Sequence, residues 1–227
     1  MKLAIVGLGK MGRLSDQLAP ELGFTVQCRI DEGGDMRQAK GADVAIEFTA
    51  PSAVVGNVEQ LAALGVPVVV GTTGWMADFD RVRDVVRIHD TALVWSPNFS
   101  IGVNVFARIV REAARLLASE SQYGAWAWEI HHETKKDAPS GTLTKLVDEM
   151  RAAGYGREIS IASSRAGAHP GTHEIGFDSA ADTITLQHSA RNREGFARGA
   201  LTAAQWIIGK KGVFEFSELL FGGRDTI

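Results

Sequence analysis

The fourteen residues EIHHETKKDAPSGT, Glu129–Thr142, combine side chains that can bind an anion and deliver a proton. His131 and His132 each carry an imidazole, whose ordinary pKa near ~6.5 suits a proton donor. Lys135 follows a few residues later and adds a cation. This combination suits an anionic substrate that must gain a proton, and either histidine could supply it.

The end of this stretch, DAPSGTLTKLVDEM, predicts a turn followed by a helix. Ser140 is a typical N-cap residue, and the N–H groups that follow it, near Gly141 and Thr142, have no partner within a helix. With the helix dipole, such groups attract a carboxylate or a phosphate. The helix start is therefore the predicted anion site.

Two other interpretations of this stretch are weaker. A zinc site of the form H-E-x-x-H would need a second histidine where the chain has Lys136, so no metal site is expected. The Ser-Gly-Thr triplet could simply cap a helix, paired lysines are usually solvated, and a lone histidine is more often structural. The density of these residues in one short stretch, beside a dinucleotide motif, favours a functional site.

That dinucleotide motif is VGLGKMG, which places Gly7, Gly9 and Gly12 in a G-x-G-x-x-G pattern after a strand-like run. The glycines let the backbone turn sharply and approach a pyrophosphate at the start of a helix. Asp31 follows the second strand-like run, where a carboxylate can bind the ribose hydroxyls of the adenosine. A glycine-rich turn that binds nothing is the alternative, but glycines, flanking elements and acid together predict a nicotinamide cofactor.

Five short apolar runs in the first hundred residues have the composition of strands buried on both faces. They alternate with helix-like segments such as Ser52–Leu64 and Met76–His89, and this order predicts a doubly wound, Rossmann-like parallel sheet. Pro20 should end or kink the first helix. The predicted strands are Leu3–Val6, Phe24–Ile30, Val44–Phe48, Val66–Val70 and Ala92–Trp95.

The pattern changes at SPNFSIGVN, Ser96–Asn104, which resembles a domain hinge. A helix should follow, and then several alternating runs, two of which predict a hairpin with its turn near Ala181. A closing helix is expected around Arg193–Ile208. The apolar stripe of the first of these helices is Val105, Ile109, Ala113 and Leu116.

We therefore predict an α/β protein with two domains. Residues 1–102 should form the dinucleotide-binding domain, to which residues 201–227 return. Residues 103–200 should form a smaller α+β domain, built on a mixed sheet, for substrate binding and oligomerisation.

The composition limits the class of protein. Apolar residues make up 45% and charged residues 22% of the 227 residues, which is ordinary for a globular protein. A net charge of −3 without a basic run argues against binding nucleic acid or a membrane surface. No apolar run approaches the ~20 residues of a membrane span. We expect a cytoplasmic protein whose single cysteine, Cys28, is a buried thiol.

HHETKKDAPSGT resembles the H-H-x-x-K-x-D-A-P-S-G-T signature of the dihydrodipicolinate reductases, enzymes of lysine and diaminopimelate synthesis in bacteria and plants. The resemblance covers the whole chain, through GKMG, EFTAP, GTTG, SPNFSIGVN, GTHEIGF and RNREGFARGAL. The chain departs from the family in a first glycine loop that is one residue shorter than the commoner form. Glu47 replaces the usual Asp, and the segment between Asp31 and Asp43 is abbreviated. These departures concern how tightly the cofactor would be bound.

The resemblance implies that NADH or NADPH reduces the dehydrated cyclic form of 4-hydroxy-tetrahydrodipicolinate to tetrahydrodipicolinate. Hydride goes to a ring carbon, and the resulting enamine is protonated. The family assigns His131 as the general acid and Lys135 to substrate binding and charge stabilisation. It also implies a homotetramer assembled through the second domain's sheet, and Arg193 and Phe196 match positions near the hinge. The implied contacts to the substrate, a small dicarboxylate, are His132, Ser140, Gly141 and Thr142.

The loops at the carboxyl ends of the predicted strands supply the expected cofactor contacts. We expect NADH to be used at least as well as NADPH, because Asp31 and Glu32 stand where a 2′-phosphate would lie and no Arg or Lys follows until Arg37. Lys10 and Arg13 could compensate. The expected contacts are Gly7, Gly9, Lys10, Met11, Gly12, Asp31, Phe48, Thr49, Gly71, Thr72, Thr73, Pro97, Asn98 and Phe99.

Two rival functions remain at this stage. One is a reductase that acts on another imine or ketone. The other is a dinucleotide sensor without catalysis, which would be expected to lose the proton donor or the anion site, yet the chain keeps His131, Lys135, Gly141 and Thr142. An assay of NADH oxidation with freshly generated substrate separates the three.

Overall fold

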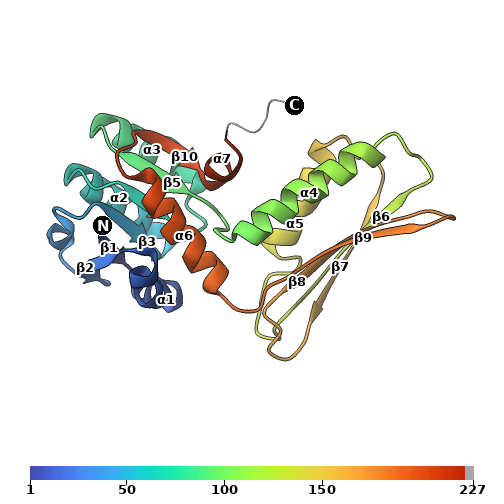
Figure 1. Ribbon diagram of the computed structural model, residues 1–227, viewed down its shortest axis with the longest axis horizontal. Helices are drawn as coiled ribbons and strands as arrows, with labels where there is room; N and C mark the ends of the chain where they lie inside the picture. The colour runs from blue at the N-terminus through green and yellow to red at the C-terminus, as the bar shows by residue number, and fades with distance from the viewer. Residues whose placement is uncertain (223–227) are drawn as a thin grey trace. The chain divides into compact units, whose positions relative to one another are not determined.

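The computed structural model describes residues 1–222, and the chain forms two compact units (Figure 1). The first unit comprises Met1–Ile101 and the described residues from Glu194 onward, and the second comprises Gly102–Arg193. The return to the first unit therefore begins at Glu194, earlier than residue 201, because one continuous helix from Glu194 to Ile207 packs on the first unit's sheet.

The first unit is built on a six-stranded sheet in the order β10-β5-β4-β3-β1-β2, in which every neighbouring pair is parallel. The predicted doubly wound sheet is thus confirmed. The strands are β1 (Lys2–Val6), β2 (Thr25–Ile30), β3 (Val44–Glu47), β4 (Val68–Val70), β5 (Ala92–Trp95) and β10 (Gly212–Glu215). The α-helices are α1 (Lys10–Leu18), α2 (Val54–Ala63), α3 (Phe79–Ile88), α6 (Glu194–Ile207) and α7 (Phe216–Phe221).

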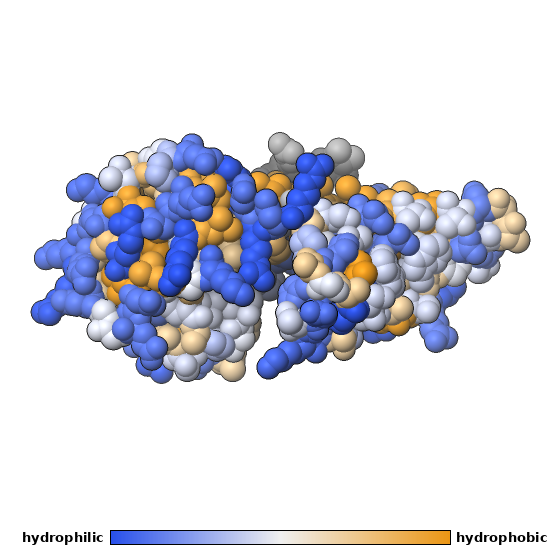
Figure 2. Space-filling model, turned by 90° about the horizontal axis from the view of Figure 1, so that it is seen from below, coloured by the Kyte–Doolittle hydropathy of each residue, from blue (hydrophilic) through white to orange (hydrophobic). Residues whose placement is uncertain are grey.

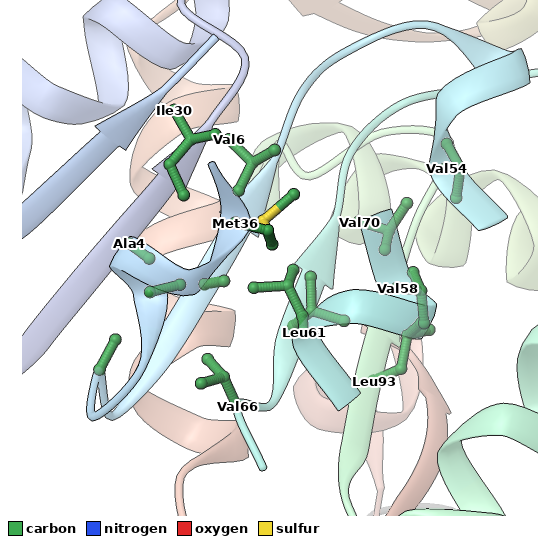
Figure 3. Close-up of a cluster of buried hydrophobic side chains, with 14 of the residues drawn as sticks. Ala4, Val6, Ile30, Met36, Val54, Val58, Leu61, Val66, Val70 and Leu93 are labelled. Carbon is green, nitrogen blue, oxygen red and sulfur yellow. The ribbon is translucent and has the colours of Figure 1, made fainter. Parts of the chain in front are cut away.

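Apolar side chains are buried on both faces of this sheet. Along β1, Ala4 and Val6 join the cluster beneath α2 and α3, while Leu3 and Ile5 join the cluster beneath α1 and α6. Successive side chains of a strand point to opposite faces, so a strand covered on both faces is apolar throughout. Figure 3 shows the first of these clusters, with Leu61 among the β-branched side chains of the strands.

Short 3-10 turns join several of these elements. Pro20 lies in one of them, directly after α1 ends at Leu18, as its fixed backbone angle predicts. Cys28 is a buried free thiol, as expected, and burial raises its pKa. The turns are η1 (Ala19–Leu22), η2 (Met36–Ala39), η3 (Pro51–Ala53) and η4 (Met76–Asp78).

The second unit is a four-stranded mixed sheet in the order β7-β6-β8-β9, with α4 and α5 packed on one face (Figure 1). The β6–β7 pair is parallel, and the β6–β8 and β8–β9 pairs are antiparallel. The predicted hairpin is β8–β9. The elements are α4 (Ile101–Leu117), β6 (Gly124–His131), α5 (Gly141–Ala152), β7 (Ile159–Arg165), β8 (Thr172–Asp178) and β9 (Thr183–Ser189).

The buried face of α4 differs from the apolar stripe named from the sequence. Val105, Ile109 and Leu116 are exposed by 40%, 49% and 59%, whereas Phe106 and Val110 are buried in the core of the second unit. Both sets obey helical spacing, so periodicity alone could not choose between them.

Within the described residues, no helix is long and apolar enough to cross a membrane.

Candidate active site

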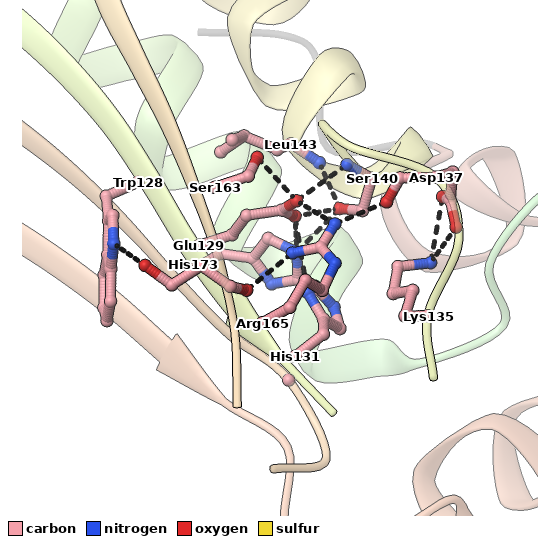
Figure 4. Close-up of polar contacts among 12 residues, drawn as sticks. Trp128, Glu129, His131, Lys135, Asp137, Ser140, Leu143, Ser163, Arg165 and His173 are labelled. Atoms are coloured by element: carbon pink, nitrogen blue, oxygen red, sulfur yellow. Dashed lines mark hydrogen bonds and ion pairs between the residues drawn. The ribbon is translucent and has the colours of Figure 1, made fainter. Parts of the chain in front are cut away.

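The end of β6 places Glu129 and His131 on the same face of the second unit's sheet, because residues two apart in a strand point the same way. The strand ends at His131, so His132 lies in the following turn. Pairing with the neighbouring strands then aligns Glu129 with His173 of β8 and with Ser163 of β7, and aligns His131 with Arg165. Figure 4 shows these side chains converging on the carboxylate of Glu129.

Glu129 is fully buried and accepts hydrogen bonds from two segments of the chain, the start of α5 and strand β7. The main-chain N–H of Ser140 donates to its Oε1 at 2.8 Å, the Ser163 hydroxyl at 3.0 Å and the Arg165 guanidinium at 2.9 Å. Its Oε2 accepts from the Ser140 hydroxyl. A buried carboxylate is tolerated when it is paired and hydrogen-bonded in this way.

The two histidines of the cluster contact the other side of this carboxylate. Nδ1 of His131 lies 3.5 Å and Nε2 of His173 lies 3.4 Å from Oε2 of Glu129. The two rings meet edge to face, with centroids 5.0 Å apart. Nε2 of His131 is directed toward Gly171, where an added Cβ would lie 2.9 Å from it.

Burial sets the charge of this cluster. Burial alone would raise the pKa of Glu129, but the hydrogen bonds from Ser140 and Arg165 bring the net pKa below its usual range. Burial lowers the pKa of His131, and Glu129 opposes that shift. Burial, and then the neighbouring His131, lower the pKa of His173 to about 4. At neutral pH the cluster therefore holds a carboxylate and a neutral His173.

The ligand atoms of Glu129, His131 and His173 all lie within 4.8 Å of one another, a spacing that a metal ion could use. The surroundings fit a cation poorly, because the guanidinium of Arg165 already neutralises Glu129 and Ser140 donates to both carboxylate oxygens. The carboxylate thus already has a cation and several hydrogen-bond donors from the protein itself. The expectation of no metal stays a prediction.

The predicted anion site begins at α5. Ser140 is its N-cap, as predicted, and the Ser140 hydroxyl accepts from the N–H of Leu143 at 3.2 Å. Gly141 is exposed at the first helical position, and no acidic residue lies in the first turn of this described helix. Because Ser140 is bonded to Glu129, the start of α5 is fixed beside the strand end that carries His131.

Lys135 and His132 lie in the loop between β6 and α5. Nζ of Lys135 donates to Oδ1 of Asp137 at 2.7 Å, and the Lys135 side chain is 23% exposed. Nδ1 of His132 lies 2.8 Å from the Thr134 hydroxyl. The predicted catalytic and substrate-binding residues thus share one small region of the second unit.

The glycine motif of the first unit makes a tight turn between β1 and α1. Gly7 has a φ of +91°, and a Cβ there would lie 2.1 Å from the carbonyl oxygen of Phe48. A Cβ on Gly12 would lie 1.8 Å from the carbonyl oxygen of Gly7. Gly9, the N-cap of α1, faces open space. This turn fits a pyrophosphate, because the helix start is accessible and no side chain of the described residues caps it.

The other predicted cofactor residues lie at the carboxyl ends of the parallel strands. Asp31 is exposed after β2, and its Oδ1 accepts from the N–H of Leu8 at 3.3 Å. The N–H of Thr49 donates to the Thr72 hydroxyl at 2.7 Å, which joins the loops after β3 and β4. The remaining positions are Lys10 and Met11 on α1, Phe48 after β3, Gly71 and Thr73 after β4, and Pro97 and Asn98 after β5.

Phe99 occupies a different environment from these loop residues. Its side chain is 3% exposed and packs against Phe216 with ring centroids 4.9 Å apart. A Cβ on Gly199 of α6 would lie 1.7 Å from the Phe99 carbonyl. The Phe99 side chain therefore belongs to the core, which leaves its main chain for any contact with a cofactor.

Sequence reasoning did not find every polar residue of the two regions. In the first unit, it noted Glu47 only as a departure from the usual Asp. Glu47 is fully buried, accepts from the Thr49 hydroxyl and from Asn57 at 3.1 Å, and has a pKa raised by burial. In the second unit, Arg165 and His173 were not singled out. A usable signal was Glu129, an acidic residue in an otherwise apolar strand two positions before His131.

Comparisons with known proteins assign both units to one family. The family model for the dihydrodipicolinate reductase N-terminus matches residues 1–99, and the model for its C-terminus matches residues 102–220. A 4-hydroxy-tetrahydrodipicolinate reductase of Christiangramia forsetii is 32% identical over 97% of this chain and 98% of its own length. Another, of Methanosarcina mazei, is 38% identical over 79% of this chain and 73% of its own length.

Solved structures show the same fold. A dipicolinate-bound dihydrodipicolinate reductase from Paenisporosarcina sp. TG-14 matches with a TM-score of 0.82 at 18% identity, over 96% of this chain and 99% of its own. An amine dehydrogenase from Mycobacterium smegmatis matches with a TM-score of 0.64 at 9% identity, over 96% of this chain and 95% of its own. The family models cover nearly the whole chain, and this protein belongs to the dihydrodipicolinate reductase family of NAD(P)H-dependent oxidoreductases.

Proposed function

We propose that this protein is a 4-hydroxy-tetrahydrodipicolinate reductase, which reduces the dehydrated cyclic substrate to tetrahydrodipicolinate in lysine and diaminopimelate synthesis. One observation carries the proposal: the hydrogen bonds of Glu129 hold the start of α5, suited to a carboxylate, beside His131, suited to donate a proton. The relatives that bear this name, one of them similar over nearly the whole chain, support it.

The first unit is the proposed cofactor-binding domain. The turn at Gly7 and Gly9 would receive the pyrophosphate, and Asp31 would receive the adenosine ribose. A nicotinamide held there would supply the hydride that a ring carbon of the substrate accepts. Thr49 and Thr72, linked across the ends of β3 and β4, would line the same edge of the sheet.

The second unit is the proposed substrate domain. The substrate is a small dicarboxylate, and one carboxylate would accept hydrogen bonds from the first turn of α5 at Gly141 and Thr142. His132 would contact the same group. Lys135 would exchange its contact with Asp137 for the substrate, so that its ammonium offsets negative charge both before and during the reaction.

His131 is the proposed general acid. Its Nε2 lies on the side of Gly171, while its Nδ1 faces the buried carboxylate of Glu129. After hydride transfer the substrate is an enamine, and its ring carbon takes the proton from Nε2. His131 is then neutral and regains a proton from solvent before the next turnover.

Assembly and location are also proposals. Both helices of the second unit cover one face of its sheet (Figure 1). Trp126 and Trp128 alternate along β6 with Ala127 of the core, so they belong to the opposite face, which is available to a second copy. The visible surface of this unit in Figure 2 is mostly white and pale blue, with few orange residues. We propose a homotetramer built through this sheet, in the cytoplasm. Sedimentation of the purified protein tests the stoichiometry.

The test of the reaction is NADH oxidation with freshly generated substrate, compared between the natural protein and two variants. His131→Gln should lower turnover by about 10²–10⁴-fold with little change in substrate binding, because a proton donor acts mainly in the transition state. Lys135→Met should raise KM and lower turnover. Affinity for NADH, measured by fluorescence, should stay unchanged in both.

Three results would contradict parts of this proposal. Absence of NADH oxidation with this substrate, together with activity on another imine or ketone, would move the protein to a different reductase. Near-normal turnover of His131→Gln would mean that His132 or water, and not His131, is the proton donor. Loss of NADH binding in both variants would contradict the division of labour between the two units.

The anion site has a separate test in Thr142→Val, which keeps the shape of the side chain and removes its hydroxyl. Pyridine-2,6-dicarboxylate, a planar relative of the substrate, should inhibit competitively. Its binding should weaken by about 1–3 kcal/mol in the variant if the hydroxyl donates to a carboxylate. Unchanged binding would place the carboxylate elsewhere.

A further inference from the structure

Glu129 links the two halves of the proposed site. It accepts the main-chain N–H and the hydroxyl of Ser140, which begins α5, and its Oε2 lies 3.5 Å from Nδ1 of His131. We propose that Glu129 is a positioning residue that fixes the ring of His131 and holds it ready to donate from Nε2, while tying it to the start of α5. This inference rests on the proposed function, in which His131 is the proton donor.

The two ring nitrogens of His131 have different surroundings. Nδ1 is buried and, among the described residues, has no hydrogen-bond partner, and the nearest carboxylate oxygen is that of Glu129. Nε2 lies beside Gly171, whose missing side chain leaves room there. A carboxylate beside Nδ1 favours the ring form that keeps its proton on Nδ1. Donation then breaks the Nε2–H bond, forms the C–H bond of the product and leaves the neutral Nδ1–H ring.

The charges around His131 come from every element that packs against it. Glu129 of β6 and Asp137 of the following loop favour the protonated ring. Lys135 of that loop and Arg165 of β7 oppose it, as does burial, which is the largest effect. His173 of β8 faces the same carboxylate and is itself influenced by His188 of β9. Glu129 is the nearest of the favourable groups, so its charge should decide how much of His131 is protonated.

A purely structural role for Glu129 is the competing explanation, since its bonds to Ser140 and Ser163 also hold the fold. Two substitutions separate charge from structure. Glu129→Gln keeps the shape and removes the negative charge, and Arg165→Met removes the cation bonded to the same carboxylate. Both substitutions break the ion pair between Arg165 and Glu129, so general damage to the fold would act alike in the two variants. If Glu129 instead acts through its charge, the two substitutions should move the pKa of His131 in opposite directions.

The matched control is Glu174→Gln, which makes the same chemical change on the neighbouring strand. Glu174 accepts from Nε1 of Trp126 at 3.3 Å and from Gln187 at 3.2 Å, on the other face of the sheet. The Glu174→Gln substitution should leave the pKa of His131 unchanged. The signal of His131 among the six histidines is assigned from its loss in His131→Gln.

The experiment combines proton NMR titration of His131 in the free protein with the pH dependence of kcat/KM. Glu129→Gln should lower the pKa of His131 by about 1 unit or more, and Arg165→Met should raise it. A general acid must be protonated, so the alkaline fall of kcat/KM should begin at a lower pH in Glu129→Gln. If the fall of kcat/KM in Glu129→Gln begins at a pH one unit lower, then at alkaline pH the kcat/KM of this variant should be about tenfold lower than that of the natural protein.

The two readouts distinguish the inference from the proposed function. A pKa of His131 that is unchanged in Glu129→Gln, or that moves the same way in both variants, would overturn the positioning role whatever the activity. A changed pKa with an unchanged pH profile of kcat/KM would leave the pairing of Glu129 with His131 intact and remove His131 as the proton donor. Opposite changes, matched in both readouts, support the inference.

Discussion

Nζ of Lys135 donates to both carboxylate oxygens of Asp137, at 2.7 and 2.9 Å, in the loop that leads to α5. This ion pair occupies the cation that is expected to bind the substrate. Asp137 is 57% exposed at its side chain, so the pair itself contributes little to stability, about 0–1 kcal/mol. Its significance is that a dicarboxylate must compete with Asp137 for Lys135.

Removing the charge of Asp137 should therefore strengthen anion binding. In Asp137→Asn we expect pyridine-2,6-dicarboxylate to bind roughly two- to fivefold more tightly, which corresponds to the energy of one exposed ion pair. The measurement is calorimetric titration at low salt, and added salt should narrow the difference. Weaker binding in the variant would show that Asp137 holds Lys135 in the productive position.

Gly171 should be required for the reaction, because a Cβ there would lie 2.9 Å from Nε2 of His131. Its φ of +136° is also one that side chains rarely adopt. Gly171→Ala should lower turnover by about tenfold or more. Gly167→Ala is the matched control, since Gly167 also has a positive φ, of +50°, but a Cβ there would meet no atom of the described chain within 4 Å. Equal turnover in the two variants would contradict a role for this space beside His131.

Much of the fold followed from local patterns, and the reasons for the exceptions are physical. The five predicted strands of the first unit match β1 to β5 within two residues, because strands buried on both faces are apolar throughout. β10 was not predicted. It pairs with β5 at the edge of the sheet, and its four residues are half-buried, so it carries little of that signal.

The residues of the candidate site also fall into those that local sequence patterns indicated and those that they did not. His131, Lys135 and Ser140 are close in sequence, and one motif could indicate all three. Arg165 and His173 reach Glu129 only through the pairing of β6 with β7 and β8, across 36 and 44 positions of the chain. The pairing register of separate strands is a property of the folded sheet, which explains why these two residues were missed.

His173 should make stability depend on pH in the weakly acidic range. Its pKa is about 4 in the folded protein, against an ordinary value near 6.5, so the unfolded chain binds a proton in this interval and the folded protein does not. The free energy of unfolding should therefore fall as pH drops from about 6.5 to about 4, by up to ~3 kcal/mol from this group. The lowered pKa of His131 acts in the same direction.

Urea unfolding of the natural protein and of His173→Gln, at several values between pH 7.5 and 4.5, measures this dependence. Comparison of slopes removes any constant cost of the substitution. The variant should lose less stability on acidification, because one titrating group is gone. Parallel curves for the two proteins would mean that His173 titrates alike in the folded and unfolded states.

The choice between NADH and NADPH should depend on Asp31. Its carboxylate stands at the end of β2 and accepts from the N–H of Leu8, so it is held beside the glycine turn, where a 2′-phosphate would meet its negative charge. Arg13, which could attract that phosphate, donates to the carbonyl of Leu8 at 2.8 Å. We expect NADH to be used at least as well as NADPH.

Asp31→Asn keeps an acceptor for Leu8 and removes the charge, so it should raise the ratio of kcat/KM for NADPH to that for NADH by about tenfold. Glu32→Gln is the matched control, and it should raise the ratio less, because it is the Asp31 carboxylate that is bonded to the glycine turn. Steady-state kinetics with both cofactors decides. A clear preference of the natural protein for NADPH, or an unchanged ratio in Asp31→Asn, would remove Asp31 from cofactor selection.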